Sequence, residues 1–175
     1  MRDLAEKWPS MPDWPTAAVD SDTLRIRAIG GLEQRLVSGD LEAWAQASGI
    51  SGGGVGAGGI AHGNRYMVRI ARDRALAVSE TPLEIAPGWH GEGFAVTVLN
   101  AGLHVFEISG RGAEELLARA TTLDTSDASP SAALSFAGVQ ALAYRHGGPG
   151  TVRVHVDRGL APYLWEWFLS RQGVC

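Results

Sequence analysis

Two stretches in the C-terminal half of the chain share one pattern of apolar and polar positions. Residues 103–120 and 151–168 each begin with an extended apolar run, pass through an Arg-Gly pair and end with apolar side chains every three to four positions. This change from strand-like to helical periodicity predicts a strand, a tight turn and a helix in each stretch. A weaker copy spans residues 36–48, with Ser-Gly at the turn. The repetition indicates a duplicated scaffold.

Short strands joined by tight turns are predicted over most of the remaining chain. Three pairs of apolar runs, each separated by turn residues, are interpreted as hairpins: 66–70 with 75–78, 94–99 with 103–108, and 133–136 with 139–144. Further strands are expected at residues 24–29 and 34–37, before a helix that Ser38 or Asp40 caps and Gly49 ends. The predicted fold class is α+β, with duplicated strand–turn–helix (ferredoxin-like) units, a mostly antiparallel sheet and the helices on one of its faces.

The chain is divided into three parts in this prediction. Residues 1–20 form an N-terminal arm with three prolines and three large apolar side chains, Trp8, Met11 and Trp14. The arm is either a frayed terminus or a segment whose tryptophans dock on a surface, because tryptophan is enriched in binding interfaces. Residues 21–93 form an N-terminal half that carries a glycine-rich segment at 48–63, which we expect to be a mobile loop. Residues 94–175 form the C-terminal α+β half.

The last helix is apolar on nearly every side. One stripe is expected in the core of the chain itself: Leu160, Tyr163, Leu164, Trp167 and Phe168. The opposite side carries Ala161, Trp165 and Leu169. In a chain this small, the second side needs cover from a loop, from the N-terminal arm or from another chain. We therefore predict a candidate partner interface formed by Trp8, Met11, Trp14, Ala161, Trp165 and Leu169.

Composition and charge exclude several classes of protein. A net charge of −4 over 175 residues argues against a dedicated nucleic-acid-binding protein, which is usually basic. No apolar run approaches the length of a membrane-spanning helix, so no membrane association is expected. The only cysteine is Cys175, which excludes an intramolecular disulfide and fits a reducing compartment. We expect a cytoplasmic protein.

Motifs for catalysis, cofactors and metals are weak. Gly54, Gly56 and Gly59 match G-x-G-x-x-G, but a dinucleotide site needs a strand before the motif and a helix after it, and here the order is reversed. The five histidines have no metal-binding spacing, and His104 and His155 are expected on an exposed sheet face. Trp89 and His90 are the best candidates for a small pocket, with a solvent-exposed loop as the alternative. We predict no catalytic, cofactor-binding or metal-binding residue.

Several short motifs in the C-terminal half together resemble a known family. They are Ser109-Gly110 after a strand, Leu116-Leu117 within a helix, Leu123-Asp124, and Tyr163-Leu-Trp-Glu-Trp167 in the last helix. In this combination, residues 94–170 resemble the gamma subunit of heterotetrameric sarcosine oxidase. The resemblance implies the architecture of the folate-binding module of glycine-cleavage T-proteins and tRNA-modification GTPases.

The resemblance also implies a noncatalytic accessory subunit that assembles with larger alpha and beta flavoprotein subunits. In that family the larger subunits hold FAD, FMN, NAD and tetrahydrofolate, convert sarcosine to glycine, pass the one-carbon unit to folate and form peroxide. This chain departs from the family at residues 97–102, which contain no carboxylate. The departure argues against folate binding by this chain alone.

Two alternatives stay open at this point. A stand-alone folate-binding or one-carbon-transfer protein would have a concave pocket with an acidic residue and Trp89 or His90 at its rim. A self-associating protein would form a homo-oligomer through the last helix.

Overall fold

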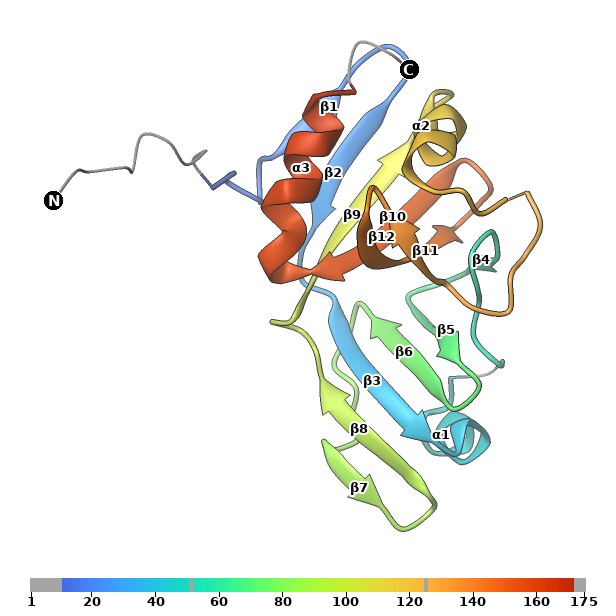
Figure 1. The fold of residues 1–175 in the computed structure, drawn as a ribbon. Helices are drawn as coiled ribbons and strands as arrows, with labels where there is room; N and C mark the ends of the chain where they lie inside the picture. The colour runs from blue at the N-terminus through green and yellow to red at the C-terminus, as the bar shows by residue number, and fades with distance from the viewer. Residues whose placement is uncertain (1–10, 51, 125, 172–175) are drawn as a thin grey trace, which may run out of the picture.

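The computed structural model describes residues 11–50, 52–124 and 126–171. These residues form two sheets, with helices on their outer faces (Figure 1). The large sheet has the order β1 (Ala18–Asp20), β2 (Arg25–Ile29), β9 (Leu103–Ser109), β12 (Thr151–Asp157), β11 (Val139–His146) and β10 (Ala133–Phe136), with β4 (Ile60–Ala61) parallel to β11. The small sheet has the order β5 (Arg65–Ala71), β6 (Arg74–Ser79), β3 (Glu33–Gly39), β8 (Phe94–Val98) and β7 (Gly88–His90). The α+β prediction with mostly antiparallel pairing is confirmed.

Within the described residues, three helices cover the outer faces of the sheets. Helices α2 (Ala113–Ala120) and α3 (Ala161–Leu169) share one apolar cluster with the large sheet, and a 3₁₀ turn, η2 (Arg158–Leu160), leads into α3. Helix α1 (Leu41–Ser48) packs on the small sheet through Trp44, which is fully buried. A third cluster contains side chains of both sheets, so strands β9 and β12 are buried on both faces.

The hairpin predictions are partly confirmed. Strands β5 and β6 pair with each other, as do β10 and β11. The predicted hairpin of 94–99 with 103–108 is wrong, because β8 pairs with β3 and β7 in the small sheet and β9 pairs with β2 and β12 in the large sheet. The chain therefore passes from one sheet to the other at residues 99–102.

Two Ser-Gly corners have the same geometry. Gly39 and Gly110 have φ values of 105° and 106°, and a Cβ atom at either position would lie 2.4 Å from a backbone oxygen, that of Gly93 or Thr23. Only glycine fits such a corner, because an L side chain disfavours positive φ and would collide with the neighbouring strand. The repeated Ser-Gly motif thus marks a strand that turns closely past its neighbour into a helix. The sheet order does not by itself establish a ferredoxin-like duplication.

The described part of the glycine-rich segment is paired with strands, where its composition predicts a mobile loop. Val55 forms a parallel bridge to β5, and the backbone N–H of Ser129 donates to the carbonyl of Ala57 over 2.7 Å. A Cβ on Gly56 would lie 1.8 Å from the backbone oxygen of Ser129, so glycine is needed for this close approach. With β4 added to the large sheet, the described part of the segment is held by strands of both sheets.

Candidate functional site

Helix α3 buries a different face from the one predicted. Its buried residues are Ala161, Leu164, Trp165 and Phe168. Leu160 is 39% exposed and Tyr163 is 50% exposed, so the prediction that they lie in the core is wrong. The buried stripe is shifted by one residue, about 100° around the helix. On the buried stripe the indole of Trp165 stacks on Phe106 of β9, with ring centroids 6.0 Å apart.

The N-terminal arm docks on its own chain. The indole of Trp14 lies 4.3 Å from the ring of His104 and 6.1 Å from that of Trp165, measured between centroids. Of the alternatives for covering the second side of α3, the structure therefore shows the arm. The expectation that Ala161 and Trp165 lie open to a partner is corrected, because both are already buried. Trp8 lies outside the described residues.

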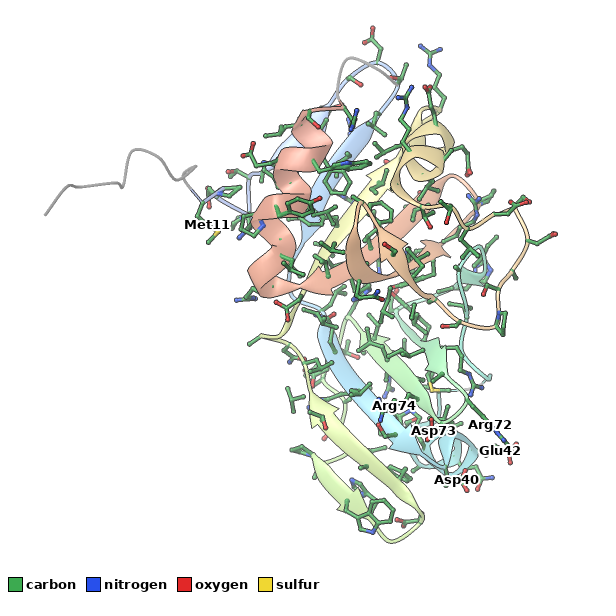
Figure 2. All side chains as sticks on the ribbon, in the orientation of Figure 1. Met11, Asp40, Glu42, Arg72, Asp73 and Arg74 are labelled. Atoms are coloured by element: carbon green, nitrogen blue, oxygen red, sulfur yellow. The ribbon has the colours of Figure 1, made fainter. Side chains whose placement is uncertain are left out.

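Exposed apolar side chains remain around α3. Leu169 is 38% exposed at the C-terminal end of α3, whereas Leu160 and Tyr163 are exposed around the start of the helix. Met11 is 69% exposed and in Figure 2 lies on the side of the molecule that carries α3. Of the predicted interface, Met11 and Leu169 are thus available to a partner.

A groove opens between the arm and the junction of the two sheets. It has a volume of about 340 Å³. Its walls come from the arm, the β2–β3 turn, the start of β9 and the η2 turn, and the residues that matter for its chemistry are Trp14, Gln34, Asn100, His104 and Arg158. The backbone N–H of Arg158 donates to the carbonyl of Gly102 over 2.9 Å, which fixes the η2 turn against the β8–β9 connection.

His104 lies in this groove and not on an exposed sheet face as predicted. It is 9% exposed because Trp14 covers it and Phe106 lies beside it, with 4.6 Å between ring centroids. Burial, and then the positive charge of Arg158, lower the pKa of His104 to about 4. Its Nε2 atom is buried without a hydrogen-bond partner among the described residues. His104 is therefore neutral at physiological pH.

Trp89 and His90 lie elsewhere, on edge strand β7 of the small sheet. The indole of Trp89 is 72% exposed. His90 contacts the carbonyl of Ala86 through Nε2 at 2.9 Å and stacks on Phe94 with ring centroids 4.6 Å apart. Neither residue lines the groove.

A relay of buried polar groups joins the two sheets. Arg153 Nη1 donates to the hydroxyl of Tyr66 over 2.8 Å, and the hydroxyls of Tyr66 and Tyr144 are 2.9 Å apart. The Tyr144 hydroxyl is 2.7 Å from His155 Nε2, and His155 Nδ1 is 2.7 Å from Gln34 Oε1. Because the amide oxygen of Gln34 only accepts, His155 Nδ1 donates to it, and the other ring nitrogen of a neutral His155 accepts from Tyr144. The donors therefore run in one direction, from Arg153 to Tyr66, to Tyr144, to His155 and to Gln34. A neutral His155 with its proton on Nδ1 satisfies every step.

Charges at the other end of this buried relay are also paired. Arg153 Nε donates to Glu107 over 3.1 Å, and Glu107 accepts a second 3.1 Å hydrogen bond from Arg27 Nε at the surface. Burial alone would raise the pKa of Glu107, but the hydrogen bonds from Arg27 and Arg153 lower it below its usual value. Burial, and then the charge of Arg153, lower the pKa of His155 to about 3.

The sequence analysis missed this relay and placed His155 on an exposed face. His155 alternates with Val154 and Val156, a pattern that fits either a solvated face or a face covered by a second sheet. The structure shows the second case, with His155 1% exposed. Burial of the whole group away from solvent fits a structural role, and only Gln34 reaches the groove.

The described residues contain neither a candidate metal site nor a candidate membrane-spanning helix. Over residues 11–50, 52–124 and 126–171, no three His, Cys, Asp or Glu side chains gather in a way that could hold a metal ion. No helix of the same residues is both long and apolar enough to cross a membrane.

Comparison with solved structures gives a match to a known fold. No family model matches the chain, and no curated protein matches it. A solved structure, the heterotetrameric sarcosine oxidase from Corynebacterium sp. U-96 in complex with pyrrole 2-carboxylate, contains a chain that superposes with a TM-score of 0.66. This chain has the fold of that sarcosine oxidase chain. The identity is 18%, which shows the fold alone, over 89% of this chain and 87% of the other.

The sarcosine oxidase match extends the resemblance found in the sequence. The motifs covered residues 94–170, whereas the fold agrees over nearly the whole chain. Because the shared part is a similar fraction of both, the two chains are of similar length.

Proposed function

We propose that this protein is the gamma-type accessory subunit of a flavin-dependent amine oxidase of the sarcosine oxidase type. The observation that carries the proposal is the fold match over 89% of this chain and 87% of a chain of a heterotetrameric sarcosine oxidase. The gamma assignment is supported by the motifs at residues 109–124 and 163–167 and by the similar lengths of the two chains. The folate-binding-module architecture belongs to the same proposal.

In this proposal the chain is noncatalytic and its partners are larger alpha and beta flavoprotein subunits. Those subunits hold FAD, FMN, NAD and tetrahydrofolate, oxidise sarcosine or a related amine, and form peroxide. This chain binds none of these cofactors and acts in the cytoplasm. Its contribution is to stabilise the assembly.

The exposed apolar side chains around α3 are the proposed docking surface. Leu160 and Tyr163 are exposed around the start of α3 and Leu169 at its end, and Met11 is exposed on the same side of the molecule. Aromatic side chains and methionine are enriched in protein interfaces, which fits Tyr163 and Met11.

Co-expression with the large flavoprotein subunits of the same source tests the proposal. We expect the wild-type chain to co-elute with them, and Leu169→Glu to weaken this association by at least about tenfold, because a charge is placed in an apolar contact. Val98→Glu is the matched control, since Val98 is 44% exposed but belongs to β8 of the small sheet. Both variants are checked for unchanged thermal unfolding. A chain that stays monodisperse in the presence of the large subunits contradicts the proposal.

The alternative of a stand-alone folate-binding protein has one observation in its favour, the groove. The groove lacks the features that this alternative predicted, because none of its described lining residues is a carboxylate and neither Trp89 nor His90 lines it. Titration of tetrahydrofolate into the isolated chain separates the two functions. Saturable binding of tetrahydrofolate without any association with the large subunits would favour the alternative.

A further inference from the structure

The groove beside Trp14 has one charged side chain among the described residues of its wall, the cationic Arg158. Arg158 is exposed, and its guanidinium makes no hydrogen bond or ion pair with any residue in the described part of the chain. The backbone at Arg158 is fixed, because its N–H donates to Gly102 and the side chain of Asp157 caps the turn through the N–H of Gly159. The turn thus places the Arg158 side chain in the wall of the groove.

Carboxylates near the groove are engaged elsewhere. Glu33 pairs with Arg35 and accepts a 3.2 Å hydrogen bond from Asn100 Nδ2. Asp13 accepts from the hydroxyl of Thr16 over 2.8 Å, and none of the described lining residues is acidic. An anion in the groove therefore meets Arg158 without a competing carboxylate in the wall.

Another part of the groove wall is aromatic. Trp14 is partly buried and presents a flat ring beside the tilted ring of His104. Leu32, Leu103 and Pro15 add apolar surface. A volume of about 340 Å³ is at the lower end of the range for small-molecule pockets.

We propose that this groove binds a small aromatic carboxylate, whose ring lies against Trp14 and whose carboxylate pairs with Arg158. Arginine suits this ligand because its planar guanidinium pairs with both oxygens of a carboxylate. A single arginine with an aromatic wall favours a monoanionic flat ligand over a phosphate, which usually meets several donors. The site is independent of the proposed assembly with larger subunits, because every lining residue belongs to this chain.

Benzoate is the probe, titrated by calorimetry into the purified full-length chain, with benzamide as its neutral analogue. We expect saturable binding of benzoate with a Kd on the order of 1 mM, as is usual for so small a ligand. Benzamide should bind about tenfold more weakly, because it cannot form the charge-assisted pair. This comparison needs no variant, so it does not depend on how a substitution affects folding.

Substitution of Arg158 then tests whether benzoate binds in this groove. Arg158→Gln should weaken benzoate by about tenfold and leave benzamide unchanged. The control is Arg72→Gln, on the β5–β6 turn at the far end of the small sheet (Figure 2). A third readout is the pKa of His104, followed by NMR, which a bound carboxylate should raise from about 4.

Three results would overturn the proposal. They are the lack of saturation below about 10 mM benzoate, equal binding of benzoate and benzamide, and an Arg158→Gln variant that binds benzoate as the wild type does. None of them bears on the proposed subunit function, which is tested by co-elution.

Discussion

Tyr144→Phe is the most direct test of the buried relay. The hydroxyl of Tyr144 accepts from Tyr66 and donates to His155 Nε2, over 2.9 and 2.7 Å. Removing it leaves a buried donor and a buried acceptor without partners, and each such group costs about 1–3 kcal/mol. The expected loss in the free energy of unfolding is therefore about 2–6 kcal/mol, a large part of the 5–15 kcal/mol that is typical of a domain.

The assay is urea unfolding followed by tryptophan fluorescence at pH 7. Tyr163→Phe is the matched control, since the Tyr163 hydroxyl also donates one hydrogen bond, to the carbonyl of Ala137, but its side chain is 50% exposed. We expect the control to lose less than about 1 kcal/mol, because water replaces the lost partner. A Tyr144→Phe variant that loses no more than this control would refute the inference that the relay stabilises the contact between the sheets.

Three further predictions follow from burial. In the folded chain the pKa of His155 is about 3, whereas in the unfolded chain the same imidazole is protonated near pH 6.5. The free energy of unfolding should therefore fall as the pH drops below 6.5, by up to about 1.4 kcal/mol per pH unit from this group. Urea unfolding at pH 7 and pH 5 measures this pH dependence, which should be smaller in His155→Gln. Trp165→Ala should cost about 3–5 kcal/mol in urea unfolding, whereas Trp89→Ala, at an exposed site, should cost less than about 0.5 kcal/mol; equal losses would contradict the packing of α3. Gly56→Ala should lower the melting temperature markedly because of its contact with a backbone oxygen, whereas Gly148→Ala, in open space, should leave it nearly unchanged; an unaffected Gly56→Ala protein would argue against the close approach.

Local patterns predicted local structure well. The turn residues between β5 and β6 and between β10 and β11 join strands that do pair, and Asp40 caps α1 through hydrogen bonds from the N–H groups of Glu42 and Ala43. The turn after β8 was assigned to a hairpin because Asn-Ala-Gly favours a chain reversal. A reversal does not determine which strands pair, and here pairing with β3 on one side and with β2 and β12 on the other takes precedence.

Which side of a helix or strand is buried was harder to predict than where the helix or strand lies in the sequence. On α3 nearly every position is apolar, so periodicity does not select the buried stripe, and the choice depends on Trp14 and Phe106, which are distant in sequence. His104 and His155 look like solvated positions until a second sheet and the arm cover them. The groove itself depends on four separate segments that meet only in the folded chain, and no short motif encodes it.

The hydrogen bond between Gln34 and His155 spans 121 positions of the chain, which has a consequence for synthesis. Every strand of the small sheet lies between residues 33 and 98, so that sheet can assemble while the ribosome is still translating the rest. Its inner face, which includes Leu76 and Val78, is covered only after β9 and β11 have been synthesised, and the hydrogen bond from His155 to Gln34 also requires β12. Such late closure leaves a nascent chain exposed to chaperones and proteases. Pausing of translation before β12 should therefore be more harmful than pausing after it.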